Sequence, residues 1–379
     1  HRDLHLSIRR QRQMCIRDRA LGLNDTPKCA RAFNQPLADY NTSHLPNPHF
    51  LDTLAKDMVR TFAPGKCILF GEHAVVYGHP AVAVAIDAGV EVELTESDSW
   101  TIEGMPFQSE KHPHISHILN DVFDYGGSPL KIEIESGLFS AAGLGSSAAL
   151  SNAMGAAVLR IMDSNSELDS IKLARIGHAA EAKAQSGRAS PTDTATSALG
   201  GCVVVAGEQV TGTKHVFDAS MVTPEGERKW SVCEVELPTD LDAWLVLGFT
   251  GIGSPTGEMV AGVAKLLEED SSKHQEMDAI AMITQAGLTA LGAGNLEAVG
   301  IAMDACHEKL QNIGVSSPEL DSLVEAVRPH SLGAKLTGAG GGGCMVALTQ
   351  HPQRVAEAIE VAGGTPLISR LGADGVRIL

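Results

Sequence analysis

Residues 141–147 place two glycines and two serines between a strand-like segment and an Ala-rich segment of helical composition. Small residues let backbone N–H groups approach phosphate oxygens, and the start of a helix adds partial positive charge. The loop lacks the GK[ST] of a Walker loop and the GxGxxG of a dinucleotide-binding turn, so a plain Gly-Ser turn also fits its composition. The candidate phosphate-binding residues are Ala141, Ala142, Gly143, Leu144, Gly145, Ser146 and Ser147.

Two other stretches are rich in glycine, APGKCILFGEHAVVYG at 63–78 and KLTGAGGGGCMVAL at 335–348. Taken in chain order, as 63–78, 141–147 and 335–348, the three stretches resemble the three signature motifs of a superfamily of small-molecule kinases. This superfamily is named GHMP after galactokinase, homoserine kinase, mevalonate kinase and phosphomevalonate kinase. The stretch at 63–78 looks most like the corresponding motif of mevalonate kinases. GRASPTDTATSALGG, at 187–201, is similar to the catalytic segment of their archaeal type.

This resemblance implies a fold and an activity. The fold is α+β and two-lobed, with an N-terminal lobe like domain 2 of ribosomal protein S5 and a ferredoxin-like C-terminal lobe. The activity is ATP-dependent phosphorylation of mevalonate to 5-phosphomevalonate, a step in the synthesis of isoprenoid precursors. ATP and mevalonate are then the expected small-molecule partners, and a homodimer is expected by analogy alone.

The resemblance assigns the chemistry of transfer to Asp193 and Lys66. Asp193, in SPTDT, matches the catalytic aspartate of the family, although an Asp after Pro is by itself typical of a turn or an N-cap. Lys66 matches the lysine beside that aspartate, where an ammonium favours the ionised carboxylate and stabilises the transferred charge. A solvated lysine at the end of a strand is the alternative.

The same resemblance places the acceptor substrate near Glu72, His73 and Thr337. His73 is expected to hydrogen-bond the substrate, and a structural histidine is the alternative. Thr337, in TGAGGGG, is expected to approach the active centre, or to pack the third glycine-rich stretch against the nucleotide loop.

Magnesium is the expected cofactor, shared with the nucleotide. Ser147 and Glu181, in HAAEAKAQ, are its predicted ligands. A solvated carboxylate on a helix face is the alternative for Glu181. Because Mg²⁺ keeps several waters and needs only one or two protein oxygens, the site does not depend on Glu181 alone.

Other functions remain open at this point. Phosphomevalonate kinase, homoserine kinase and mevalonate-3-kinase belong to the same superfamily and differ in pocket residues that one sequence places poorly. A non-catalytic relative that binds ligand is a further alternative, against which the presence of Lys66, Ser147 and Asp193 argues.

Alternating and periodic segments surround these residues and must position them. Residues 130–136 alternate like a strand, and residues 114–127 resemble a short amphipathic helix. Strand-like segments flank the third glycine-rich stretch, and the chain closes with strands at 366–372 and 375–379. Longer helices are predicted at 146–162, 168–186, 257–269, 275–292, 295–311, 318–327 and 352–362.

The composition of the whole chain is that of a globular protein with 44% hydrophobic and 20% charged residues. A formal net charge of −17 argues against a nucleic acid or an anionic membrane as partner. No apolar run reaches the ~20 residues of a membrane span. The seven cysteines form no CxxC pair, so zinc and disulfide frameworks are disfavoured and the reducing cytoplasm is the expected location.

The 379 residues are expected to divide into two domains, at 58–225 and 226–379, after a different N-terminal segment. Residues 1–57 carry 9 Lys and Arg against 6 Asp and Glu, whereas the remainder carries 20 against 40. We interpret residues 1–57 as a non-native or disordered extension, with Met58 as a plausible native start.

Overall fold

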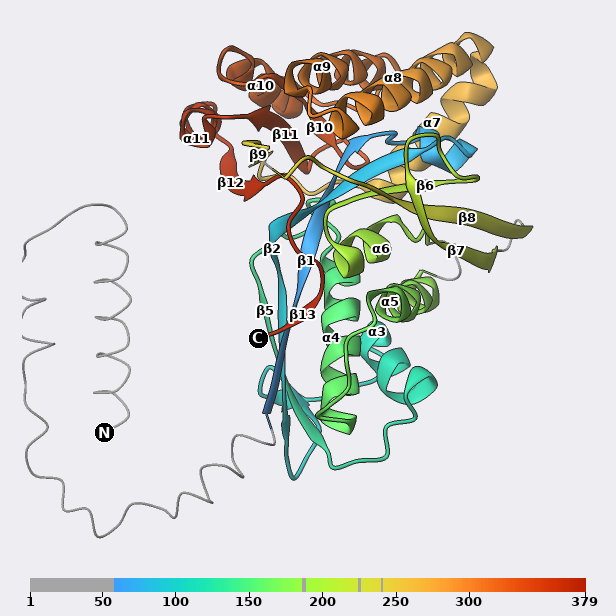
Figure 1. Cartoon of the computed structure of the whole chain (residues 1–379), viewed down its shortest axis with the longest axis vertical. Helices are drawn as coiled ribbons and strands as arrows, with labels where there is room; N and C mark the ends of the chain where they lie inside the picture. Colours follow the sequence, from blue (N-terminus) through green and yellow to red (C-terminus); the bar gives the residue numbers. More distant parts are fainter. Residues whose placement is uncertain (1–57, 186–188, 224–225, 240) are drawn as a thin grey trace, which may run out of the picture. The chain divides into compact units, whose positions relative to one another are not determined.

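The computed structural model describes residues 58–379 except for 186–188, 224–225 and 240. These residues form two sheets with helices packed against them (Figure 1), and all of them fall within the compact unit 55–379. The predicted N-terminal extension, 1–57, lies outside the described residues. Among the helices that are described, none combines the length and the apolar character that crossing a membrane requires.

The first sheet is organised around β2 (Ala81–Glu96). β1 (Met58–Phe70) runs antiparallel to it along one edge, while β5 (Leu130–Ser136) and β6 (Cys202–Ala206) share the opposite edge. β5 confirms the strand predicted from its alternating sequence. The remaining strands of this sheet are β3 (Thr101–Ile102), β4 (Met105–Pro106), β7 (Lys214–Thr223), β8 (Gly226–Val235) and β13 (Arg377–Ile378).

The first sheet extends beyond the predicted domain boundary. β8 begins at Gly226 and pairs with both β6 and β7, and β13 returns from the end of the chain to pair with β1. Residues on both sides of position 225 therefore contribute to this sheet. The division into 58–225 and 226–379 stays a prediction for the domains themselves.

The second sheet is antiparallel throughout and has the order β10-β11-β9-β12. All residues of β10 (Gly333–Thr337) and β11 (Cys344–Thr349) are buried, which explains their almost continuous apolar sequence. The glycine-rich run at 338–343 joins them, as predicted. β9 (Trp244–Phe249) and β12 (Thr365–Arg370) complete the sheet.

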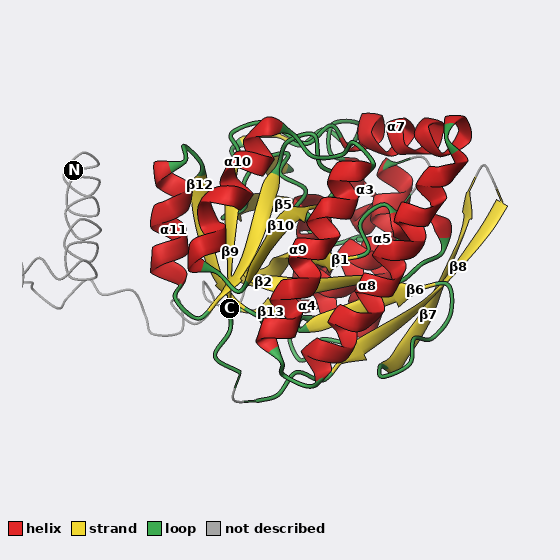
Figure 2. Cartoon of the chain, turned by 90° about the horizontal axis from the view of Figure 1, so that it is seen from above, coloured by secondary structure: helices red, strands yellow, loops and turns green. Residues whose placement is uncertain are grey.

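The predicted long helices are confirmed, with shifts of one or two residues at their ends. Side-chain caps fix several starts: Asn295 accepts from the Ala298 amide, and Ser317 accepts from the Leu320 amide. Figure 2 shows the helices beside the sheets. They are α4 (Ser146–Met162), α5 (Ser170–Ala184), α7 (Thr256–Glu269), α8 (His274–Gly292), α9 (Leu296–Asn312), α10 (Pro318–Val327) and α11 (Pro352–Val361).

The shorter helical segments depart from the prediction. The helix expected at 114–127 is one turn, α3 (Pro113–Ser116), followed by the π-helical segment η4 (His117–Val122). α6 (Thr192–Leu199) was not predicted, because its Thr- and Ser-rich sequence after a proline is typical of a turn. The 3₁₀ segments are η3 (Ala74–Tyr77), η5 (Ser271–Lys273) and η6 (Arg328–His330).

The second sheet and the helices α8 to α11 form the second lobe, and the hydrophobic core continues into it from β1. Phe70 at the end of β1 is fully buried and belongs to the same apolar cluster as β9, β11 and helices α8–α10. At Gly287 of α8, a Cβ atom would lie 2.5 Å from the Phe70 ring. The glycine thus permits a close approach that locks β1 to α8, and the first strand becomes part of both lobes.

A buried histidine of α9 lies beside β10 and α10. His307 of α9 accepts a hydrogen bond through Nδ1 from the Leu336 amide (3.2 Å), and its Nε2 lies 3.2 Å from the Asp321 carboxylate. Burial, together with the charges of Lys335 and Arg328, lowers the pKa of His307 to about 4 against the opposite effect of Asp321. The folded protein therefore holds this imidazole neutral.

We predict an acid-dependent loss of stability that depends on His307. Both states hold the ring neutral well above pH 6.5. As the pH falls from about 6.5 towards 4, the unfolded chain takes up the proton first, and up to about 3 kcal/mol of stability is lost. Urea unfolding at several pH values should therefore show that His307→Gln, which keeps an acceptor, loses less stability on acidification than the wild type. Parallel curves for the two proteins would contradict this assignment.

Candidate active site

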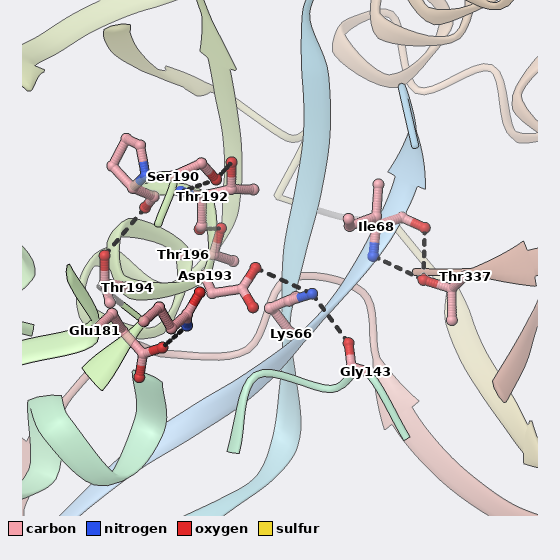
Figure 3. A network of polar contacts seen from close by, with 12 residues as sticks. Lys66, Ile68, Gly143, Glu181, Ser190, Thr192, Asp193, Thr194, Thr196 and Thr337 are labelled. Carbon is pink, nitrogen blue, oxygen red and sulfur yellow. Dashed lines mark hydrogen bonds and ion pairs between the residues drawn. The ribbon is translucent and has the colours of Figure 1, made fainter. Parts of the chain in front are cut away.

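Lys66 of β1 lies at the centre of the candidate site (Figure 3). Its Nζ is 3.1 Å from Oδ1 of Asp193 and donates a hydrogen bond to the Gly143 carbonyl oxygen at 3.0 Å. Lys66 is 4% exposed, whereas the Asp193 side chain is 41% exposed. The structure therefore brings together the predicted catalytic pair and the predicted phosphate loop, with the carboxylate on the solvent side of a buried ammonium.

The loop at 141–147 is shaped by glycines and by β1. The Lys66 amide donates to the Leu144 carbonyl oxygen at 2.9 Å, which holds the loop against the strand. Gly143 and Gly145 adopt φ values of 75° and 74°, in the left-handed region that glycine enters without strain. α4 follows directly, and in the described structure its Gly145 N-cap provides no side-chain hydrogen bond. The first amides of α4 are therefore left uncapped by a side chain, as an anion-binding helix start requires.

Asp193 belongs to the first turn of α6, and buried threonines hold that turn in place. Thr196 donates to the Thr192 carbonyl oxygen (2.7 Å), and Thr194 donates to that of Pro191 (3.2 Å). The side-chain Nδ2 of Asn152, on α4, donates to the Thr194 carbonyl oxygen at 2.9 Å. α6 is thus fixed to the helix that begins at the predicted phosphate loop, and the position of the carboxylate follows from both.

Glu181 of α5 lies beside Ser147, as the predicted metal pair requires. The carboxylate contacts the Ser147 hydroxyl, Gln185 Nε2 at 2.5 Å and His114 Nε2 at 3.1 Å. Burial alone would raise the pKa of Glu181, but the contacts with His114, Ser147 and Gln185 outweigh it and hold that pKa below its ordinary value. A charged carboxylate and a hydroxyl are oxygen donors of the kind that Mg²⁺ prefers.

These donors fit a divalent cation only in part. Glu181 Oε1 is buried and faces His114 without an aligned hydrogen-bond partner among the described residues, so at least one of its lone pairs remains for a ligand. Nowhere in the described part of the chain does a group of three or more His, Cys, Asp or Glu side chains lie so that it could hold a metal ion. Phosphate oxygens and water would have to complete the coordination.

Glu72 and His73 follow β1, and their contacts lead to the second lobe. Buried Glu72 forms an ion pair with Lys335 of β10, which also donates to the Leu336 carbonyl oxygen at 2.6 Å. His73 Nε2 is 2.9 Å from the Ala339 carbonyl oxygen, so this nitrogen carries the hydrogen. Burial raises the pKa of Glu72 and lowers that of His73. A role of the two side chains in substrate binding stays a prediction.

The hydroxyl of Thr337 forms two hydrogen bonds with the backbone of β1. Its Oγ1 accepts from the Ile68 amide and donates to the Ile68 carbonyl oxygen, each at 2.9 Å (Figure 3). With 2% exposure, the side chain ties β10 to β1 two residues beyond Lys66. The hydroxyl thus contacts β1 rather than the loop at 141–147, and the predicted contact of Thr337 with substrate stays a prediction.

Three contributors to the site were not predicted from the sequence: His114, Gln185 and Lys335. Lys335 carried a usable signal, since a lysine within the otherwise apolar strand sequence before TGAGGGG requires a buried partner. His114 carried none, because only the packing of α3 against α5 brings it to Glu181. Gln185 follows Glu181 by four residues, a spacing that places two side chains of one helix side by side.

Comparisons with known proteins give a consistent result. The family model for the GHMP kinases N terminal domain matches residues 114–201, and the model for GHMP kinases C terminal matches residues 288–364. The chain is 34% identical over 352 residues to the mevalonate kinase of Pyrococcus furiosus, covering 83% of this chain and 97% of that protein. With the mevalonate kinase of Archaeoglobus fulgidus it shares 35% identity over 297 residues, 76% of this chain and 90% of the relative.

Solved structures share the fold. The Methanococcus jannaschii mevalonate kinase matches with a TM-score of 0.65 and 25% identity, covering 83% of this chain and 98% of that one. The L. major mevalonate kinase in complex with R-mevalonate matches with a TM-score of 0.68 and 23% identity, covering 82% and 96%. The L. lactis galactokinase complexed with galactose also matches, with a TM-score of 0.61 and 21% identity, over 85% of this chain and 95% of that one. The two-lobed α+β fold is thus shared by kinases with different acceptors.

We predict that Gly145→Ala lowers the free energy of unfolding more than Gly→Ala does at another glycine of positive φ whose surroundings are open. A Cβ at Gly145 would lie 3.2 Å from Lys66 Cγ and 3.3 Å from its Cε, beside Asp193 Oδ2 at 3.6 Å. The left-handed φ costs about 1 kcal/mol, and displacement of Lys66 from its partners adds about 1–2 kcal/mol.

The matched control is Gly363→Ala, after α11. Gly363 has a φ of 89° with nothing within 4 Å of the added Cβ, so only the backbone cost applies. Urea unfolding of both variants measures the difference, and equal losses would show that the Lys66 contacts do not restrict residue 145.

Proposed function

Because the chain belongs to the GHMP kinase family and matches archaeal mevalonate kinases over most of its length, we infer that it transfers a phosphoryl group from ATP to mevalonate. The observation that carries the chemistry is the contact of Lys66 with both Asp193 and the Gly143 carbonyl oxygen. It joins a carboxylate that can receive a proton to a loop that can hold phosphates. The sequence likeness to archaeal mevalonate kinases carries the choice of acceptor.

In the proposed reaction, the acceptor hydroxyl attacks the γ-phosphorus of ATP. The new P–O bond forms as the bond to the oxygen bridging the β- and γ-phosphorus atoms breaks, and ADP leaves. Asp193 takes or orients the proton of the attacking hydroxyl, for which its partly exposed carboxylate is suited. Lys66 keeps that carboxylate in place and offsets the negative charge that develops on the transferred group.

The nucleotide phosphates are proposed to bind the amides of residues 141–147 and the start of α4. Their negative charge is stabilised there by the uncapped amides and the partial positive charge of the helix. A divalent cation, proposed to be Mg²⁺, would bind Ser147 and Glu181 and neutralise phosphate charge.

The acceptor side is proposed to lie next to the segment that follows β1, with Glu72, His73 and Thr337 shaping it. Another GHMP kinase activity is the alternative, since the fold is shared by kinases of several acceptors. Homodimer formation and a cytoplasmic location stay predictions. A ligand-binding relative without activity is less consistent with the site, because it would be free to lose the Lys66–Asp193 pair.

A substrate panel tests this proposal directly. ADP release, measured in a coupled assay with Mg²⁺ and ATP, should be fast with mevalonate and near background with phosphomevalonate, homoserine and galactose. Phosphorus NMR of the product should show the phosphate at the 5-position. Preference for another acceptor would replace mevalonate in the proposal, and no ADP release with any of them would contradict a kinase.

We predict that Asp193→Asn retains nucleotide binding but loses turnover. The amide keeps the shape of the side chain and cannot accept the proton, so kcat should fall by roughly 10²- to 10⁴-fold. Asp218→Asn is the matched control, since Asp218 lies on β7 and pairs with His215 at 2.9 Å. Calorimetric titration with a non-hydrolysable ATP analogue separates binding from turnover. Near-normal kcat in Asp193→Asn would remove this residue from the chemistry.

A further inference from the structure

The carboxylate of Glu181 is held by contacts from three directions. Gln185 comes from the end of its own helix, Ser147 from the first turn of α4, and His114 from α3. Gln185 can restrain the side chain only along α5, and Ser147 is itself a proposed cation ligand. Of these three contacts, His114 is therefore the one that comes from another helix and has no proposed part in coordinating the cation.

α3 is anchored well enough to serve as a support. The Ser116 amide donates to the His112 carbonyl oxygen at 2.9 Å, and Ile115 and Ile118 are buried in the core of the first lobe. The imidazole of His114 extends from this anchored turn to Glu181, and its side chain is 21% exposed. A ring fixed at its base and half-enclosed by protein has little freedom to leave the carboxylate.

The contact with His114 leaves Glu181 Oε1 able to coordinate a cation. His114 Nε2 lies 3.1 Å from Glu181 Oε1, yet neither atom has an aligned hydrogen-bond partner among the described residues. A carboxylate oxygen has two lone pairs, so Oε1 can face the imidazole and still coordinate a metal ion. The contact thus limits the rotation of the carboxylate without using up its capacity to bind.

We propose that His114 is a positioning residue that orients the Glu181 carboxylate towards Ser147, so that the two oxygens receive the divalent cation of the bound nucleotide. The inference rests on the proposed function, because it concerns the cation of that same site. Groups that orient a ligating carboxylate contribute strongly, and their loss typically weakens metal affinity by about 10- to 100-fold.

The test measures cation affinity rather than turnover. Free Mn²⁺ is followed by its electron paramagnetic resonance signal while it is titrated into full-length protein saturated with a non-hydrolysable ATP analogue. His114→Ala should weaken the Mn²⁺ affinity of the complex by about 10- to 100-fold. His114→Gln places an amide N–H near the position of Nε2 and should recover part of that loss.

His117→Ala is the matched control. It removes a histidine three residues further along the same segment, whose Nδ1 pairs with Asp121 at 2.7 Å, and it should leave the Mn²⁺ affinity within about twofold of the wild type. Thermal melting of each variant shows whether it is folded. If His114→Ala is unfolded, the comparison of His114→Gln with His117→Ala decides, since only a positioning role predicts an intermediate affinity for the former.

The outcomes separate the inference from the proposed function. Unchanged Mn²⁺ affinity in a folded His114→Ala variant overturns the role of His114, whereas mevalonate-dependent ADP release by the wild type still supports the kinase. An equal loss in His117→Ala also overturns it, because the effect would then belong to the packing of the segment. A wild type that neither binds Mn²⁺ with nucleotide nor releases ADP overturns both.

Discussion

The buried ammonium of Lys66 is the interaction on which the rest of the site depends. A charge that is 4% exposed needs compensating partners, since an unpaired one would cost several kcal/mol. Two partners satisfy it here, the Asp193 carboxylate and the Gly143 carbonyl oxygen. Because each comes from a different segment, the single charge from β1 sets the spacing between the loop at 141–147 and α6. The positions of the predicted nucleotide site and the predicted catalytic carboxylate are therefore not independent of each other.

The second lobe supports the same strand from the other side. Thr337 binds the backbone of Ile68, and the ion pair of Glu72 with Lys335 joins the end of β1 to β10. A buried ion pair of this kind costs much desolvation, so it is weak evidence for stability and better evidence for a fixed arrangement. The first and third glycine-rich motifs thus form one unit in space, although about 260 residues separate them.

Much of this could be predicted where the pattern is local. The helix at 146–162 follows from composition, and the strand at 130–136 from alternation. α6 could not be predicted, since its Thr-rich sequence has a weak intrinsic preference for helix and depends on contacts such as that of Asn152 with Thr194. The hairpin of β7 and β8 was also missed, because the exposed start of β8, at residues 226–229, shows no alternation. The partners of Glu72 and Glu181 required the tertiary structure.

Backbone strain links the two lobes to the chemistry. Among the described residues, only four that are not glycine have positive φ, and two of them, His73 (60°) and Ala141 (52°), lie in the first and second motifs. The second lobe contacts both residues. The Ala339 carbonyl oxygen accepts from His73 Nε2, and the Ser254 amide donates to the Ala141 carbonyl oxygen at 2.8 Å. Such conformations cost of order 1–3 kcal/mol and persist only where surrounding contacts over-determine them. The loop proposed to hold phosphate and the turn proposed to face the acceptor therefore keep their shapes through contacts with the other lobe, and the two lobes must be docked for both halves of the site to exist at once.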